Sequence, residues 1–263
     1  MSKLRHFDGN TPYSSRFAVN DMSEAYTLRQ NHLLEAFPAN VQKRLFPHLK
    51  LESLPLGMVL YESGLALRQV YFPIDSIVSL QYLTESGASV EVSMVGNEGL
   101  VGIGSLLSDE ITTSRALVQS PGHAYSLSPQ RLRKEFNNSR EVETLLLRYI
   151  QSLLTNMAQT AICNRYHSIS QRLCRWLLLS LDRLPGNRLD TTHELIANML
   201  GVRREGVTYS ACKLQKLGVI EYKRGHIMVL DRSKLEQLCC ECYAVAKNET
   251  DRLETCHPMS EVS

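Results

Sequence analysis

The chain has 263 residues, of which 43% are hydrophobic and 21% are charged. This composition is typical of a globular protein, and the length suffices for two domains with cores of their own. No stretch approaches the roughly 18 apolar residues that span a bilayer, and the first residues lack the apolar core of a secretory signal. We therefore expect a cytoplasmic location and no membrane contact.

Positive charge is concentrated in one segment of the chain. The formal net charge is +2, but residues 171–234 contain 12 Lys and Arg against 6 Asp and Glu, so the remainder carries a net charge of −4. A solvated basic face would explain the surplus of positive charge, but it would not explain why the surplus coincides with a DNA-binding motif. Neutralisation of DNA phosphates requires the same surplus, and the motif described below lies in the same segment.

Residues 1–28 are polar and lack periodicity, which predicts a flexible arm. A helical pattern follows from Asn31 to Leu49. Between residues 51 and 127, short apolar or alternating runs are separated by Gly, Pro, Asp or Asn. These runs are predicted strands: Met58–Tyr61, Val70–Phe72, Ile77–Tyr82, Ser89–Met94, Ala116–Val118 and His123–Tyr125. Their spacing favours a small antiparallel β-barrel or jelly roll within a first domain at residues 29–138.

Residues 139–166 are predicted to form one long helix. An apolar stripe runs along it: Val142, Leu145, Leu146, Tyr149, Ile150, Leu153, Leu154 and Met157. This stripe is wider than a small barrel can cover, so a parallel helix–helix dimer is the favoured interpretation. The alternative is a core helix that packs only within its own chain.

Residues 167–247 are predicted to form a second domain. A helix at Ser168–Leu184 ends at a Pro-Gly-Asn sequence, and residues 219–230 contain two short strands around a Gly turn. A last helix is expected from Ser233, where Ser-Lys-Leu-Glu matches a capping box. The tail at residues 248–263 is predicted to be disordered.

Residues 191–218 predict two short helices joined by a tight turn. A Thr-Thr pair precedes the first helix, and Gly201 ends it. Arg203, Arg204 and Glu205 begin the second helix, at the end that contacts base edges when such a helix enters the major groove. With the two following strands, this pattern predicts a winged helix-turn-helix that binds a specific sequence of double-stranded DNA.

This order of elements resembles the Crp/Fnr family of bacterial transcription regulators. The resemblance extends over residues 33–242 and is strongest at 168–178 and 192–220, where Arg204 and Glu205 match the Arg-Glu pair that opens the family's recognition helix. It implies an α+β fold, in which the first domain is a cyclic-nucleotide-binding-like β-barrel or jelly roll, the long helix mediates dimerisation, and the second domain is a winged helix-turn-helix. The implied partners are a second copy of the chain, DNA and RNA polymerase.

The resemblance also implies roles for single residues. Arg204 would donate two hydrogen bonds to a guanine, and Glu205 would accept one from a cytosine amino group. Arg203 would contact a base or a phosphate, and Thr192 would anchor a phosphate. The other residues assigned to the DNA interface are Tyr209, Lys213, Lys223 and Arg224.

The first domain departs from the family at the ligand site. Ile103 and Thr113 stand where the cyclic-AMP receptor has the Glu and the Arg that bind ribose and cyclic phosphate. Because a buried phosphate needs a cationic partner, cyclic-AMP binding of the family type is disfavoured. Three alternatives stay open: a receptor with rearranged ligands, Glu98 and Arg115; an unknown small-molecule effector; or a purely structural barrel.

All seven cysteines lie from Cys163 onward, and their odd number argues for reduced thiols. The absence of an earlier cysteine excludes the iron–sulfur cluster that some members of the resembled family carry. Cys239, Cys240 and Cys242, with Cys256-His257 further on, leave a zinc site or a redox role open. Burial of Cys239 and Cys242 on one face of a helix is the simpler interpretation, so we expect no metal and no cofactor.

An enzyme or a scaffold built on the barrel is the alternative from another class. A metal cupin needs several close His residues and a carboxylate, whereas His123 is the only His among the predicted strands. The glycines at residues 96–104 lack the Lys of a phosphate-binding loop. We therefore expect no enzymatic activity; the alternative predicts no salt-dependent affinity for DNA.

Overall fold

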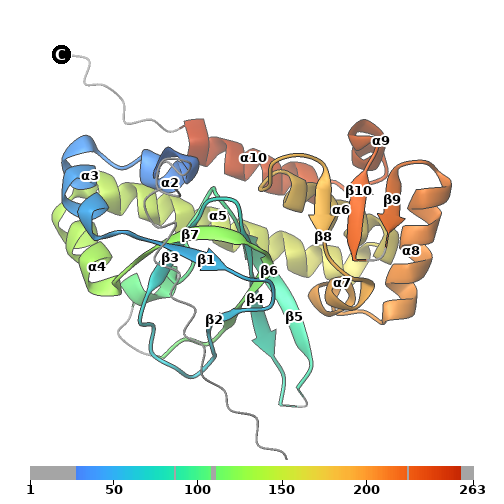
Figure 1. The fold of residues 1–263 in the computed structure, drawn as a ribbon, viewed down its shortest axis with the longest axis horizontal. Helices are drawn as coiled ribbons and strands as arrows, with labels where there is room; N and C mark the ends of the chain where they lie inside the picture. Colours follow the sequence, from blue (N-terminus) through green and yellow to red (C-terminus); the bar gives the residue numbers. More distant parts are fainter. Residues whose placement is uncertain (1–27, 86, 108–110, 224, 256–263) are drawn as a thin grey trace, which may run out of the picture.

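The computed structural model describes residues 28–255 apart from 86, 108–110 and 224, so nearly all of the predicted arm and the Cys256-His257 pair lie outside the described residues. Figure 1 shows a β-rich N-terminal domain and a C-terminal domain, with the long helix α5 (Arg140–Tyr166) running from one to the other. Among the described helices, none is both long enough and apolar enough to cross a membrane.

Short helical turns precede the strands. The helical segment expected at residues 31–49 is divided, because Pro38 starts a new helix. Its parts are η1 (Leu28–Gln30), α2 (His32–Glu35), α3 (Ala39–Leu45) and η2 (Phe46–His48). The Asn31 side chain caps α2 by accepting from the Leu34 amide, and it donates to the Pro73 and Gly99 carbonyls at 2.9 Å each. This buried amide fixes α2 against the strands.

Two antiparallel sheets form the N-terminal domain. The first has the order β1 (Lys50–Leu54), β7 (Gly122–Leu127), β3 (Val70–Pro73), and the second β2 (Val59–Tyr61), β6 (Arg115–Ser120), β4 (Ile77–Leu83), β5 (Ser89–Val95). Residues from both sheets share one core: Leu54, Tyr71 and Ala124 from the first, Val78, Val95 and Val118 from the second. The predicted antiparallel β domain is confirmed, although the described strands form two sheets and not a closed barrel. Strand β1 was not predicted, because Lys, Glu and Ser interrupt its apolar pattern.

Helix α4 (Pro129–Asn138) leads into α5, which Ser139 caps by accepting from the Val142 amide. The predicted apolar stripe of α5 divides between two faces. Its first part is buried in the chain's own core: Val142, Leu145, Leu146 and Tyr149. These four residues therefore pack within their own chain, as the alternative of a core helix predicted, and they are not available for a dimer seam. A second apolar row of α5 is exposed: Leu147, Leu154 and Ile162.

The C-terminal domain contains the predicted helix-turn-helix and wing. Its elements are α6 (Ile169–Leu181), β8 (Arg188–Asp190), α7 (His193–Leu200), α8 (Arg204–Lys216), β9 (Ile220–Lys223), β10 (His226–Val229), α9 (Arg232–Gln237) and α10 (Cys242–Thr255). Strand β10 lies between β8 and β9 in an antiparallel sheet. Trp176, Ile196, Val207 and Ile227 bring α6, α7, α8 and this sheet into one core.

The end of the chain differs from the prediction in two respects. Asp231, and not Ser233, caps α9, because its carboxylate accepts from the Lys234 amide at 2.9 Å. The disorder expected from residue 248 is wrong as far as residue 255, since α10 continues through this segment and packs alongside α5 (Figure 1). Leu253 contributes to the core against which α5 packs.

Candidate nucleic-acid interface

The turn before α8 is shaped by a capping threonine and a left-handed glycine. Thr192 caps α7 by accepting from the Leu195 amide at 3.2 Å. Gly201 ends α7 at φ 60°, a conformation that other residues rarely adopt. The Val202 amide then donates back to the Ala197 carbonyl at 3.0 Å. These contacts fix the direction in which α8 leaves the turn.

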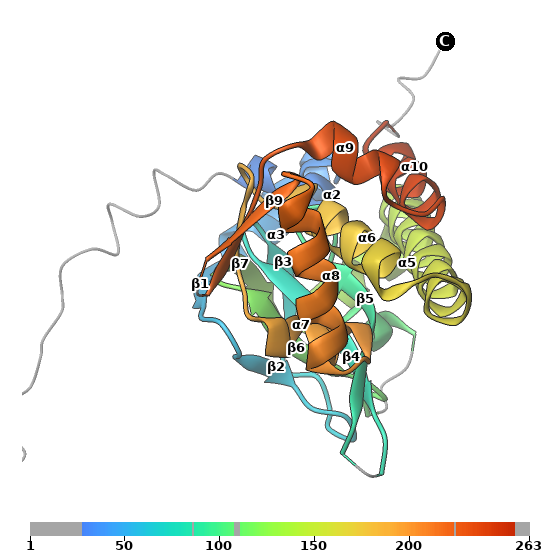
Figure 2. The same ribbon diagram turned by 90° about the vertical axis from the view of Figure 1, so that its right-hand side faces the viewer.

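Helix α8 buries one face and exposes the other. Val207, Ala211 and Leu214 are buried. Glu205, Tyr209 and Lys213, spaced by four residues, lie exposed on one side, and Tyr209 is 74% exposed. Arg203 and Arg204 at the start of the helix are also exposed. Figure 2 shows α8 lying across the surface of the domain, where a partner can reach it.

The Arg204 guanidinium is accessible. Its Nε lies 4.0 Å from Oε2 of Glu194, and the two side chains are 67% and 64% exposed. An exposed pair at this distance contributes little free energy. A DNA base or phosphate can therefore replace Glu194 as the partner of Arg204 at small cost.

Gly206 allows α8 to approach α6. A Cβ atom at this position would lie 2.8 Å from Cδ1 of Ile169 on α6. A larger residue at position 206 would therefore require the end of the Ile169 side chain to move, a packing contact that the sequence did not reveal.

The wing is held against the helix-turn-helix by His193. Its ring stacks on Tyr222 of β9 with centroids 4.0 Å apart, and its Nδ1 lies 3.0 Å from Oγ1 of Thr208. Burial, followed by the positive charge of Arg204, lowers the pKa of His193. Lys223 ends β9 and pairs with Glu221 at 3.0 Å. The other predicted wing contact, Arg224, lies outside the described residues.

The residues considered for an effector site have other partners in the structure. Glu98 is buried and bonds to Arg183, whereas Arg115 pairs with Glu62 at 3.2 Å. Thr113 lies 3.2 Å from the Tyr82 hydroxyl. Ile103 begins the turn η3 (Ile103–Leu106) and is buried in the apolar core. Glu98 and Arg115 thus each form an ion pair within the chain, with Arg183 and Glu62 respectively.

The two domains meet through polar groups as well as apolar ones. Sulfur of Met199 on α7 accepts from Oγ of Ser79 at 3.1 Å and from Nε2 of Gln81 at 3.2 Å, both on β4. A cavity of about 30 Å³ beside this contact is lined by charged side chains that include Glu91, Arg175 and Arg183. The helix-turn-helix is therefore docked directly on the second sheet of the N-terminal domain.

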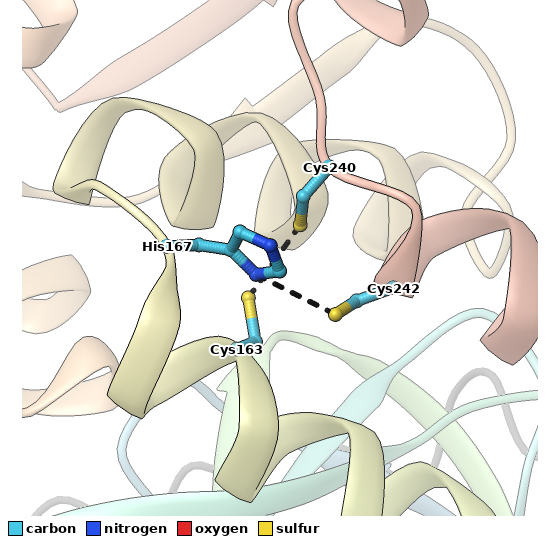
Figure 3. A group of neighbouring side chains, drawn as sticks. All are labelled: Cys163, His167, Cys240 and Cys242. Carbon is cyan, nitrogen blue, oxygen red and sulfur yellow. Dashed lines mark hydrogen bonds between the residues drawn. The ribbon is translucent and has the colours of Figure 1, made fainter.

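The cysteines are arranged differently from the prediction. Cys239 and Cys242 do not share a helix face, because α9 ends at Gln237 and α10 begins at Cys242. Cys240 and Cys242 instead lie beside Cys163 and His167 at the end of α5 (Figure 3). These four residues could hold a metal ion, and sequence spacing missed them because 73 residues separate the two pairs along the chain.

Residues 171–238 match the family model of the Crp-like helix-turn-helix domain. This part of the chain is a Crp-like helix-turn-helix domain. No curated protein shows significant similarity to the sequence. The exposed start of α8 thus lies within the part of the chain that matches this family model.

Solved structures extend the likeness to the N-terminal domain. FixK2 from Bradyrhizobium japonicum has 15% identity and a TM-score of 0.61, covering 73% of this chain and 98% of that one. A Crp-family transcriptional regulator from Thermus thermophilus has 18% identity and a TM-score of 0.60, covering 71% and 95%. The c-di-GMP responsive global regulator CLP from Xanthomonas campestris has 18% identity and a TM-score of 0.57, covering 73% and 99%. The chain thus shares the fold of these structures over both domains, and residues 171–238 also match the model of the Crp-like helix-turn-helix domain.

Proposed function

We propose that two copies of this chain bind a near-palindromic DNA site, each inserting the start of α8 into a major groove. The observation that carries the proposal is the exposure of Arg203, Arg204 and Glu205 at the free end of a helix whose other face is buried. In this arrangement Arg204 pairs with a guanine and Glu205 with a cytosine. Tyr209 lies one turn further on and contributes to base preference.

Three more residues are proposed to bind phosphates. Thr192 lies at the N-terminus of α7, where the backbone amides favour an anion. Lys213 on α8 and Lys223 on β9 are exposed and extend from neighbouring elements. Contacts of this kind position the protein on the duplex and supply affinity without reading bases.

The exposed apolar row of α5 supports a dimer. Leu147 and Leu154 are seven residues apart, and Ile162 follows after eight, which places them on one side of the helix. Two such helices, packed in parallel, would bury these three side chains and present two copies of α8 about one DNA turn apart.

We further propose that the protein acts in the cytoplasm and that RNA polymerase is a partner. The N-terminal domain would be a structural unit or the binding site of an effector of unknown chemistry.

Selection of bound duplexes from a random pool, followed by footprinting, tests the proposal. We expect a near-palindrome whose half-sites are about one helical turn apart. Fluorescence anisotropy should then show that Arg204→Ala weakens binding by about 1–3 kcal/mol and relaxes preference at one base pair. Arg131→Ala, an exposed arginine on α4, removes the same charge from the other domain and is the matched control. Equal loss on every duplex would show that Arg204 contacts only phosphate.

A further inference from the structure

Four metal-binding side chains meet where the long helix ends. Cys163 lies in the last turn of α5, and His167 is its C-cap residue. Cys240 and Cys242 come from the connection between α9 and α10 and from the first residue of α10. One ligand atom from each residue lies within 4.8 Å of all the others. Figure 3 shows the three sulfur atoms and the imidazole turned toward a common centre.

Two distances within this group match those of a single tetrahedral ion, and all four ligand atoms lie within 4.8 Å of one another. Zinc with bonds of about 2.3 Å to sulfur and about 2.0 Å to nitrogen places neighbouring ligand atoms roughly 3.5–3.8 Å apart. Here the Cys163 and Cys240 sulfur atoms are 3.6 Å apart, and the Cys242 sulfur lies 3.6 Å from Nδ1 of His167. A disulfide would require about 2 Å between two sulfur atoms, and it would leave the third thiol and the imidazole unexplained.

The surroundings of the four residues are those of a closed site. Cys163 and Cys242 are 1% exposed and Cys240 is 6% exposed, so the thiols are shielded from solvent. Three thiolates and one imidazole form a soft donor set that selects zinc over magnesium or calcium. The buried Arg175 lines a small cavity together with Cys163, and its positive charge would partly offset the net negative charge of a zinc ion with three thiolates.

The second nitrogen of His167 supplies an independent observation. Nδ1 faces the sulfur atoms, and Nε2 lies 3.3 Å from Oε1 of Glu241. A carboxylate that accepts from the remote imidazole nitrogen is the usual support of a metal-bound histidine, because it fixes the ring and its tautomer. Glu241 stands between the two cysteines of the short Cys-x-Cys segment, so one segment supplies two ligands and this support.

We propose that Cys163, His167, Cys240 and Cys242 bind one structural zinc ion. Binding would release the thiol protons to solvent and form three zinc–sulfur bonds and one zinc–nitrogen bond. With four protein ligands, the ion has no open position for catalysis. The ion ties α10 to the end of α5 directly before Ser168, the capping residue of α6. It therefore braces the joint between the long helix and the Crp-like domain.

Metal analysis of the full-length chain, purified without a histidine tag and under reducing conditions, tests the proposal directly. We expect about one zinc ion per chain by mass spectrometry of the elements. Replacement of zinc by cobalt(II) should give the absorption of a tetrahedral site with thiolate ligands. A folded chain that contains no zinc, and that takes up neither zinc nor cobalt(II) on titration, would overturn the proposal. A Cys163–Cys240 disulfide that persists in the presence of the reductant would also overturn the proposal, because it would indicate a redox pair.

Variants separate these ligands from the neighbouring thiols. Cys240→Ser should lose the zinc, whereas Cys239→Ser, which changes the adjacent and half-buried cysteine, should retain it. Cys212→Ser is a second control, since this thiol is exposed and belongs to α8. Glu241→Gln should retain the ion with affinity lowered about 10–100-fold in a chelator competition. Loss of zinc from Cys239→Ser with retention in Cys240→Ser would refute the ligand set. If a variant does not fold, the zinc content and cobalt(II) absorption of the wild-type chain still test the proposal.

Discussion

Arg183, just beyond the end of α6, donates from Nε to Oε1 of Glu98 at 2.8 Å, and both side chains are buried. The pair joins the Crp-like domain to the loop after β5 in the N-terminal domain. Oε2 of Glu98 accepts from the Gly96 amide at 3.1 Å, and Nη1 of Arg183 donates to the Leu179 carbonyl at 2.8 Å. Each charge therefore has partners on its own side of the interface as well as across it.

Removal of one member of this pair should destabilise the protein strongly. Arg183→Met leaves the Glu98 carboxylate buried beside a single amide, and breaking a buried pair in this way costs about 3–5 kcal/mol. We expect that loss in the free energy of unfolding, measured with urea. The double variant Glu98→Met/Arg183→Met should lose less than the single one, because no uncompensated charge remains. Losses that simply add would show that the two residues do not interact.

Lys213 and Arg204 should differ in how they affect DNA binding. Lys213→Ala removes a phosphate contact, so we expect a similar loss of affinity on every duplex and a salt dependence with its slope reduced by about 1. Arg204→Ala should instead weaken the selected site more than a scrambled one. Binding isotherms at several salt concentrations measure both effects. An unchanged slope for Lys213→Ala would remove this residue from the interface.

The elements with local sequence signals were predicted correctly. The helix-turn-helix needs only an apolar period, a capping threonine and Gly201, which lie within 28 consecutive residues. The strands between residues 51 and 127, except for β1, likewise appeared as short apolar or alternating runs bounded by turn residues. The exposure of Arg204 follows from the same helical period that buries Val207.

The features that depend on distant segments were not predictable in this way. Glu98 seemed available to a ligand because no local sequence pattern indicates its contact with Arg183, which lies 85 residues later in the chain. The cysteine cluster forms because α10 returns along α5, and neither helix alone brings Cys163 to Cys240. Long-range packing, and not local propensity, decides both contacts.

Glu91 on β5 should make stability depend on pH. Burial raises the pKa of this carboxyl from 4.5 to about 7, although Ser79, Arg175 and Arg183 oppose the rise. The unfolded chain loses the proton near 4.5 and the folded chain retains it until about 7, so the free energy of unfolding falls as the pH rises through this window. The stabilising contribution is complete below pH 4.5 and lost above 7.

Glu91→Gln tests this dependence, because the amide resembles the protonated acid. We expect the variant to gain on the wild type as the pH rises, by up to about 3 kcal/mol at pH 8. Urea unfolding at pH 5 and pH 8 measures the difference. Glu85→Gln on the exposed β4–β5 turn makes the same chemical change without burial and is the control. Identical pH profiles for Glu91→Gln and the wild type would disprove the assignment.

Leu154 should be essential for the proposed dimer and dispensable for the fold. Its side chain is 56% exposed in the single chain, in the middle of the apolar row of α5. In a parallel dimer each copy would bury this leucine, which is worth about 1.5–3 kcal/mol per side chain, and a lysine there would place two like charges against each other. We expect Leu154→Lys to form monomers in analytical ultracentrifugation while its circular dichroism stays unchanged. The monomer should also bind a single half-site with the same affinity as the full site.

Leu65→Lys is the matched control for Leu154→Lys, because it changes a leucine that is 58% exposed in the N-terminal domain, and this variant should remain dimeric. A Leu154→Lys variant that sediments as a dimer would place the interface elsewhere than on α5.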